Sequence, residues 1–290
     1  MHNNIILAKQ FIPILDEIYQ LASLTSDLDG SPELVKAGAN ADEMCIPMID
    51  MSGLGDYDRN SGYVNGDVSL GWETVKCNYD RGRMFQVDNM DNQESANIAF
   101  GKLASEFIRT KVAPEIDAFR FAAYAALKNI SKASGTLADG MAVIAALRAA
   151  TTKMDEDEVP AEERYLYITP TLKGMVDDLD TTKSKEVFKK FAKVIEVPQR
   201  RFYTAITLKS GANEEERVGG FVKADGAADI NFEIIHKPAV IQFPKHIAPK
   251  VIDPSQNQTA DAWKYGYRNV GIAKGYENKR AGIYVHHKGV

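Results

Sequence analysis

The sequence predicts an α+β fold, and three stretches support that prediction. A long amphipathic helix is expected over residues 91–129, a two-stranded ribbon over 41–91, and alternating helices and strands from 137 onward. With 290 residues, of which 44% are hydrophobic, the chain can bury a substantial core. Its length is typical of about two domains. We therefore expect a folded protein organised around one dominant helix.

An amphipathic segment over 5–24 opens the chain, with its apolar residues on one face. Such a face packs either on its own domain or on a neighbouring chain, and the sequence leaves both alternatives open. Asp16 and Glu17 interrupt the apolar run, so we expect no signal peptide. No stretch of the chain is long and apolar enough to predict a membrane span.

The ribbon predicted over 41–91 is the least compact part of the chain. An apolar strand over 44–51 and an alternating strand over 68–74 flank a polar, glycine-rich tip at 52–67. An isolated two-stranded ribbon is marginally stable in water, and long excursions from a compact domain are usually functional. The ribbon therefore needs a surface to lie on, and another copy of the chain can supply it.

The helix predicted over 91–129 has the most regular apolar stripe in the sequence. Asp91 and Glu94 form a capping box at its start. Pro114 lacks a backbone donor and crowds the carbonyl of Thr110, which predicts a kink, and the stripe resumes in phase afterwards. The stripe consists of Phe100, Leu103, Phe107, Ile116, Phe119, Ala123, Leu127 and Ile130.

Helices and strands alternate after the long helix, which indicates an α/β subdomain. Aromatic-rich strands around Tyr265, Tyr267 and 283–285 close the chain. The other expected elements are helix 137–153, strand 164–170, helix 171–179, helix 183–194, strand 197–208 and strand 230–243.

Composition and motifs argue against several function classes. A net charge of -5 and a pI near 5.6 are not typical of a surface that grips nucleic acid or an anionic membrane. Cys45 and Cys77 form no CxxC motif and indicate two free thiols in a reducing compartment. The chain has no nucleotide, metalloprotease or hydrolase motif, and none of its five histidines has a nucleophile at a recognised spacing. We expect no catalytic site and no cofactor.

One local pattern is similar to a calcium-binding loop. Asp56, Asp58, Asn60 and Asp67 fall at the first, third, fifth and twelfth positions of such a loop. The glycine required at the sixth position is displaced, because Ser61 stands there, and an aspartate at the twelfth is a poorer bidentate ligand than glutamate. A polar loop tip without metal is the favoured interpretation.

Several segments of the chain, in their order and spacing, resemble one protein family. The junction between ribbon and helix contributes Asp80, Arg81, Gly82, Phe85, Asp88, Met90, Asp91 and Glu94, and the helix contributes Pro114, Glu115, Ile116, Asp117, Phe119 and Arg120. Further segments are VPAEERYLYITP, VPQRRFYT, INFEIIHKPAVI with Lys245, DAWKYGYRN and GIYVHH. Together they resemble the major capsid proteins of tailed double-stranded DNA phages, which have the Hong Kong 97 fold shared with encapsulin shells. The resemblance covers nearly the whole chain.

The resemblance implies a Hong Kong 97-like capsid fold and a structural function. Copies would form hexamers and pentamers of an icosahedral shell in the virion, assembled in the host bacterial cytoplasm, that encloses double-stranded DNA without sequence-specific binding. The implied partners are other copies, a portal and scaffolding proteins, with no membrane. The implied parts are an N-terminal arm (1–40), an extended β-hairpin loop (41–91), a peripheral domain with a spine helix (92–136), an axial α/β domain (137–235) and return strands to the peripheral domain (236–290).

The resemblance also implies contacts between subunits. An ion pair within one chain is the alternative to a subunit contact for two pairs of residues, Arg81 with Asp88 and Glu115 with Arg120. The residues expected at such contacts are Asp56, Arg59, Arg81, Asp88, Asp91, Glu115, Asp117, Arg120, Trp263 and Arg268.

Two departures from the family pattern can be read from the residues. Some members join subunits through an isopeptide bond from a lysine in the extended loop, and this chain has no lysine between Glu43 and Val75. We therefore expect noncovalent cohesion. The short N-terminal segment leaves little room for a fused scaffold, so we expect a separate scaffold or none.

Two other functions remain open from the sequence. The first is an encapsulin-like compartment that holds a cargo enzyme. The second is a soluble α/β enzyme in which 52–67 forms a flexible lid over a cleft near His236 or the acidic tip.

Overall fold

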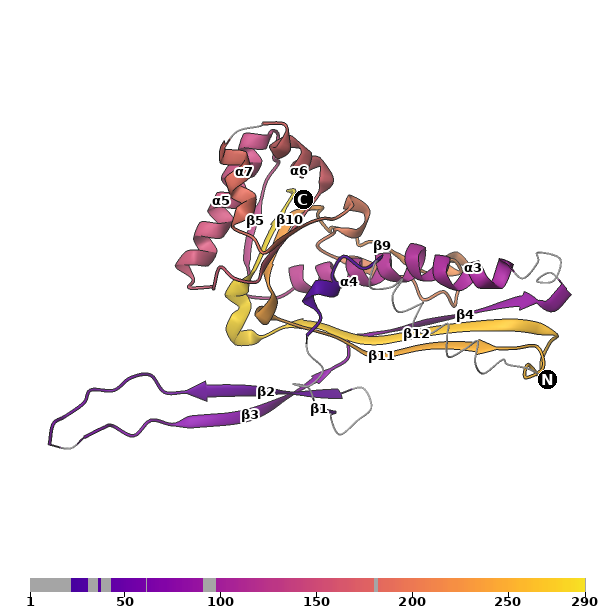
Figure 1. The fold of residues 1–290 in the computed structure, drawn as a ribbon, viewed down its shortest axis with the longest axis horizontal. Helices are drawn as coiled ribbons and strands as arrows, with labels where there is room; N and C mark the ends of the chain where they lie inside the picture. Colours follow the sequence, from indigo (N-terminus) through magenta and orange to yellow (C-terminus); the bar gives the residue numbers. More distant parts are fainter. Residues whose placement is uncertain are drawn as a thin grey trace.

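The computed structural model describes residues 22–30, 36–37, 43–60, 62–90, 98–179 and 182–289. It has three parts, which are a long antiparallel sheet with a helix along it, a compact α/β unit, and a ribbon that projects from the body (Figure 1). The predicted α+β class is confirmed.

The long sheet has three antiparallel strands in the order β11-β12-β4. They are β4 (Tyr79–Asp88), β11 (Val240–Ile252) and β12 (Ala262–Gly275). Tyr265 and Tyr267 of the central strand are buried towards the helix, because strand side chains alternate between the two faces. This sheet provides the base on which the helix lies.

The long helix has two α-helical parts joined by a π-helical turn. These parts are α3 (Ile98–Phe107), η3 (Ile108–Val112) and α4 (Ala113–Ala125). The wide turn lies just before Pro114, where a missing donor and a bulky ring disturb the regular ladder. The predicted irregularity is therefore present as a π turn, and the helix ends at Ala125, four residues before the predicted end. The capping box of Asp91 and Glu94 lies outside the described residues.

The α/β unit contains a five-stranded mixed sheet in the order β5-β13-β10-β6-β7. Helices α5 (Gly140–Glu156), α6 (Pro170–Asp177) and α7 (Thr182–Lys189) cover one face, and α4 covers the other with Phe121 and Tyr124. Because both faces are covered, the central strand β10 is buried along its whole length. The strands are β5 (Ser131–Ser134), β6 (Arg164–Ile168), β7 (Lys193–Glu196), β10 (Ile230–His236) and β13 (Ile283–His287).

Three sequence predictions in this region need correction. The helix predicted over 183–194 ends at Lys189, because Lys193–Glu196 pairs with β6 as a parallel strand. The strand predicted over 197–208 is instead the 3-10 turn η4 (Gln199–Arg201) followed by the short strand β8 (Ile206–Leu208). The prediction for 236–290 placed the closing strand β13 together with β11 and β12. In the structure β13 lies between β5 and β10, in the sheet of the α/β unit.

Several short elements complete the described chain. Strand β8 pairs with β9 (Phe221–Lys223) in a small hairpin, and η5 (Glu214–Glu216) lies in the loop between them. The remaining 3-10 turns are η1 (Ser26–Leu28), η6 (Lys237–Ala239) and η7 (Glu277–Gly282).

The ribbon is formed by β2 (Glu43–Met51) and β3 (Val68–Lys76), with the two-residue β1 (Lys36–Ala37) at the edge of β2. Its register runs from Glu43 opposite Lys76 to Met51 opposite Val68. The root of the ribbon is held by a small apolar cluster with β11 and β12, and the rest extends away from the body (Figure 1). That cluster contains Met44, Ile46, Val75, Ile241, Phe243 and Ile272.

Candidate functional site

The outer part of the ribbon exposes large apolar side chains. Val68, Leu70 and Trp72 alternate along β3 and therefore share one face, and Leu70 is 63% exposed. At the tip, Tyr63 is 87% exposed. Soluble monomers rarely expose contiguous apolar patches of this kind, which mark interaction surfaces. The exposed set also includes Met51, Leu54, Tyr57 and Val64.

Local hydrogen bonds shape the tip at 52–67. Ser52 N donates to the carbonyl of Asp67 at 2.9 Å, which closes the ends of the tip. Asp58 Oδ1 accepts from Asn60 N at 2.6 Å, an arrangement that tightens a turn and uses this carboxylate within its own loop. Among the described residues, no three His, Cys, Asp or Glu side chains gather where they could hold a metal ion. Asp56, Asp58 and Asp67 are therefore exposed carboxylates of an acidic tip.

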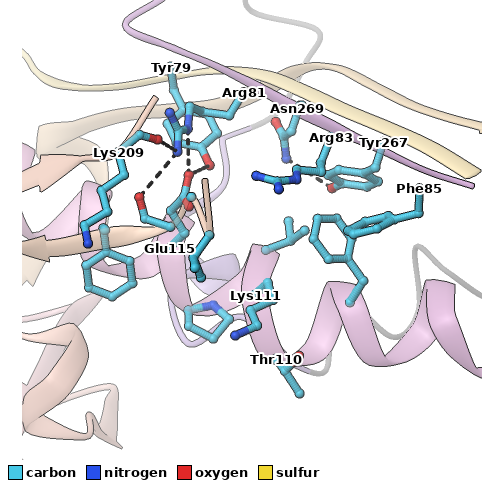
Figure 2. Close-up of a pocket in the computed structure, with 18 of the residues that line it drawn as sticks. Tyr79, Arg81, Arg83, Phe85, Thr110, Lys111, Glu115, Lys209, Tyr267 and Asn269 are labelled. Carbon is cyan, nitrogen blue, oxygen red and sulfur yellow. Dashed lines mark hydrogen bonds and ion pairs between the residues drawn. The ribbon is translucent and has the colours of Figure 1, made fainter. Parts of the chain in front are cut away.

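Arg81 connects three elements at the junction between ribbon and body. Its Nε donates to Glu115 of α4 at 2.9 Å, and its Nη2 donates to the carbonyl of Lys209 at 2.7 Å (Figure 2). Tyr79 also donates to Glu115, at 3.1 Å, and burial together with this carboxylate raises the pKa of Tyr79 well above its usual range. The chain contains an ion pair at Arg81, but with Glu115 and not with the predicted Asp88.

Asp117 lies at the centre of a buried polar network. It is fully buried and accepts hydrogen bonds from Ser23 Oγ at 2.9 Å and from Leu24 N at 3.0 Å. Thr25 Oγ1 donates to it at 2.8 Å, and Arg201 Nη1 donates at 3.1 Å. The network therefore joins the residues before η1 to the helix and to η4.

Arg120 extends this network towards Asp29. It donates to Thr25 Oγ1 at 2.8 Å and to Asp29 Oδ1 at 3.2 Å. Burial raises the pKa of Asp29, while Arg120 and a hydrogen bond from Gln242 oppose that rise. The partner of Arg120 is thus Asp29 and not the predicted Glu115. Asp117 and Arg120 are both buried within their own chain, and their predicted role at a subunit contact stays a prediction.

Three of the remaining predicted contact residues, Arg268, Asp88 and Trp263, lie on the long sheet. Arg268 on β12 pairs with Asp80 on β4 at 2.6 Å, and this hydrogen-bonded pair lowers the pKa of Asp80. Asp88 is exposed and accepts from Met90 N at 2.9 Å, and Trp263 is half-buried. Arg59 is exposed at the ribbon tip, and Asp91 lies outside the described residues.

Sequence reasoning missed a cleft between β4, the long helix and the β8–β9 hairpin (Figure 2). Its volume is about 1000 Å³, and Phe85, Phe107 and Tyr267 form a continuous aromatic wall inside it. Cations from four separate segments, Arg83, Lys111, Arg200 and Lys209, also line it. No local sequence pattern brings these together, because they converge only through tertiary packing.

Solved structures with a similar fold cover nearly the whole chain. The capsid structure of cyanophage P-SCSP1u matches with a TM-score of 0.57 and 11% identity, over 88% of this chain and 85% of that chain. A chain from Gordonia phage Cozz has a TM-score of 0.60 and 11% identity, over 92% and 87%. The chain has the fold of phage capsid proteins. The resemblance inferred from the sequence is therefore confirmed at the level of the fold.

The same capsid fold occurs outside these phage structures. A virus-like particle from Pyrococcus furiosus matches with a TM-score of 0.55 and 9% identity, over 93% of this chain and 98% of that chain. No sequence-family model and no curated protein matches the chain, so its relation to capsid proteins rests on structure. Within the described part of this capsid-fold chain, no helix is long and apolar enough to cross a membrane.

Proposed function

We propose that this chain is the major capsid protein of a tailed phage, which assembles with copies of itself into a closed icosahedral shell. The observation that carries the proposal is the ribbon, a long β-hairpin whose outer part exposes large apolar side chains such as Leu70 and Tyr63. A capsid fold with such a ribbon supports self-assembly, because a neighbouring copy buries what one copy leaves exposed.

The finer parts of this proposal follow from the Hong Kong 97 resemblance. The ribbon over 41–91 acts as the extended loop that lies on a neighbour, and the helix over 92–136 acts as the spine of a peripheral domain. The α/β unit over 137–235, joined by β13, acts as the axial domain around fivefold and sixfold centres. Copies form pentamers and hexamers of the virion shell in the host bacterial cytoplasm, with a portal and a scaffold as partners.

The proposed content of the shell is the double-stranded DNA genome. A chain with a net charge of -5 would confine DNA without neutralising many phosphates, which suits a genome that must leave again. The role is structural and not catalytic. Surface contacts between subunits are proposed for Asp56, Arg59, Asp88, Trp263 and Arg268.

An encapsulin-like compartment is the second candidate function. The similarity to the Pyrococcus furiosus virus-like particle favours it, because that match covers 98% of the other chain. An enzyme with a lid has less support, because the ribbon tip extends away from β10, the strand that carries His236 (Figure 1).

Electron microscopy of the purified protein, combined with size-exclusion chromatography, tests the proposal. We expect closed icosahedral particles, and a shell that copurifies with an enzyme inside would favour the compartment. A protein that stays monomeric at high concentration, with 52–67 folded against its own body, would contradict both shell functions.

A further inference from the structure

The cleft beside β4 is lined by more cations than carboxylates, although the whole chain has a net charge of -5. Each carboxylate of the lining already forms an ion pair within the chain. These pairs are Glu115 with Arg81, Glu106 with Arg109, and Asp80 with Arg268. The lining cations that form no ion pair with a described carboxylate are Arg83, Lys111, Arg200 and Lys209. This cationic cleft is therefore suited to an anionic ligand.

Arg83 is held in the cationic cleft by a loop that leaves space for it. Its Nη2 donates to the carbonyl of Arg217 at 2.7 Å, so β4 is tied to the loop that follows β8. A Cβ atom at Gly211 would lie 2.9 Å from Arg83 Nη1, and one at Gly219 would lie 3.0 Å from it. Both glycines have positive φ angles, +71° and +66°, which favour glycine. The loop thus leaves room for this guanidinium, which reaches into the cleft in Figure 2.

The long helix contributes its irregular turn to the same cleft. Thr110, Lys111 and Val112, all part of the π-helical turn η3, line it. Such turns are rare and occur frequently at functional sites. Lys111 comes from the helix and Lys209 from the β8–β9 hairpin, so two separate elements bring their charges to the cleft (Figure 2). A ligand between them would contact both elements.

The interior of the cationic cleft is aromatic. The rings of Phe85 and Phe107 meet edge to face at 4.8 Å, and the ring of Phe107 lies 6.2 Å from that of Tyr267. Another flat ring can extend this wall, because aromatic rings pack favourably edge to face or in offset stacks. Nucleobases pack against protein aromatic side chains in the same way, whatever the base.

Size and charge together indicate the class of ligand. The cleft volume of about 1000 Å³ lies at the upper end of the ~300–1,000 Å³ typical of small-molecule sites. A matching ligand carries several negative charges and one flat ring. Phosphates suit the lining arginines, because a guanidinium donates two parallel hydrogen bonds to phosphate oxygens. A dicarboxylate carries fewer charges, and inorganic polyphosphate has no ring, so neither matches the whole lining.

We propose that the cationic cleft binds a nucleoside triphosphate. The base lies against the wall of Phe85 and Phe107, and the phosphates lie against Lys111, Lys209 and Arg200. Such a site goes beyond the proposed shell function and does not depend on it.

Isothermal titration calorimetry of the full chain with ATP tests the site. We expect ATP to bind at least about tenfold more tightly than adenosine or tripolyphosphate, because each of these lacks one half of the matching chemistry. Binding should weaken as the salt concentration rises, because salt screens exposed charges. The absence of binding at millimolar ATP, or equal affinities for ATP and tripolyphosphate, would overturn the site. A single-stranded oligonucleotide that binds more tightly than ATP would overturn its assignment to a free nucleotide.

Charge reversal locates the site. Lys111→Glu with Lys209→Glu is expected to reduce the affinity for ATP at least about tenfold. The matched control, Lys128→Glu with Lys250→Glu, makes the same change in net charge at two exposed lysines outside the cleft lining and should change the affinity less than about twofold. The thermal unfolding midpoint shows that both variants are folded. Equal losses of affinity in the two variants would overturn the location.

Photolabelling of the wild-type chain gives a second readout that needs no variant. After illumination with 8-azido-ATP and digestion, we expect the label in peptides that contain Phe85, Phe107 or Tyr267, and excess ATP should prevent it. Label confined to peptides that line no part of the cleft would overturn the site. Closed particles formed by a chain that binds no ATP would do the same and leave the shell function standing.

Discussion

Arg81 Nε lies 2.9 Å from Glu115 Oε1, so the first strand of the long sheet is joined directly to the middle of the long helix. The ribbon enters the body immediately before this pair, because only Cys77 and Asn78 separate β3 from β4. Asn78 itself is fixed by Ala273 of β12, whose N donates to Asn78 Oδ1 at 3.0 Å. The direction of the ribbon is therefore set at a rigid junction.

Replacing Arg81 tests this junction. We expect Arg81→Ala to lower the free energy of unfolding by about 2 kcal/mol, between the values typical of exposed and of fully buried pairs. The loss arises because Glu115 stays partly buried without its cation. Urea denaturation followed by circular dichroism measures it. The double variant Arg81→Ala with Glu115→Gln should lose less free energy of unfolding than the sum of the two single variants. A loss equal to that sum would show that the two residues are not coupled.

Replacing Asp117 tests the buried network that holds the residues before η1. Asp117→Asn is expected to cost about 3 kcal/mol, because Arg201 and Ser23 lose a charged acceptor in a dry site. Limited proteolysis should then cut more rapidly near Thr25. The control is Glu106→Gln, which alters an exposed pair with Arg109 and should change stability little. Equal effects of the two substitutions would contradict the assigned role of Asp117.

Glu233 predicts an unusual dependence of stability on pH. Neither carboxylate oxygen of Glu233 has a hydrogen-bond partner among the described residues. Burial raises the pKa of Glu233 well above the ordinary value of 4.5, and Lys132 only partly opposes this rise. The pKa of Glu233 is higher in the folded state than in the unfolded state. Its contribution to stability is therefore fully present below pH 4.5 and is lost as pH rises through the folded-state pKa. The Glu233→Gln variant should lose less stability than the wild type over this range. Parallel unfolding midpoints for the two proteins from pH 4 to pH 9 would contradict this account.

Covalent linkage between subunits can be tested on assembled particles. Because no lysine lies between Glu43 and Val75, the outer part of the ribbon has no side-chain amine for an isopeptide bond. Particles boiled in SDS are therefore expected to run as one band at 32.0 kDa. Persistent bands at multiples of this mass, in reducing conditions, would reveal another covalent bond.

Local patterns in the sequence predicted the elements that depend on local physics. The helix expected over 137–153 is observed at Gly140–Glu156, where Asp139 accepts from Ala142 N at 2.7 Å as a cap. The ribbon followed from its alternation and its glycine-rich tip. Pro114 marked the irregular turn of the long helix because proline disturbs any helix interior.

Nonlocal contacts account for what the sequence did not predict. Arg81 and Glu115 are 34 positions apart, and no periodicity connects them. Strand β7 is only four residues long and lies a short turn after helix α7, so its pairing with β6 decides its conformation. The cationic cleft likewise depends on how the β8–β9 hairpin packs beside β4. No short motif in the sequence predicts this packing.

The ribbon tip gives the most direct test of the link between fold and assembly. Replacing 53–66 with Asn-Gly would join Ser52 to Asp67 through a two-residue turn, and the backbone bond between these residues already sets the hairpin register. The removed residues whose burial is described are all exposed except Gly62, which is half-buried, so the unfolding midpoint of the subunit should be unchanged. Closed particles should disappear, because the acidic and aromatic groups that another copy would bind are gone. Size-exclusion chromatography and electron microscopy measure this outcome, and normal particles from a correctly folded variant would show that assembly does not need the tip.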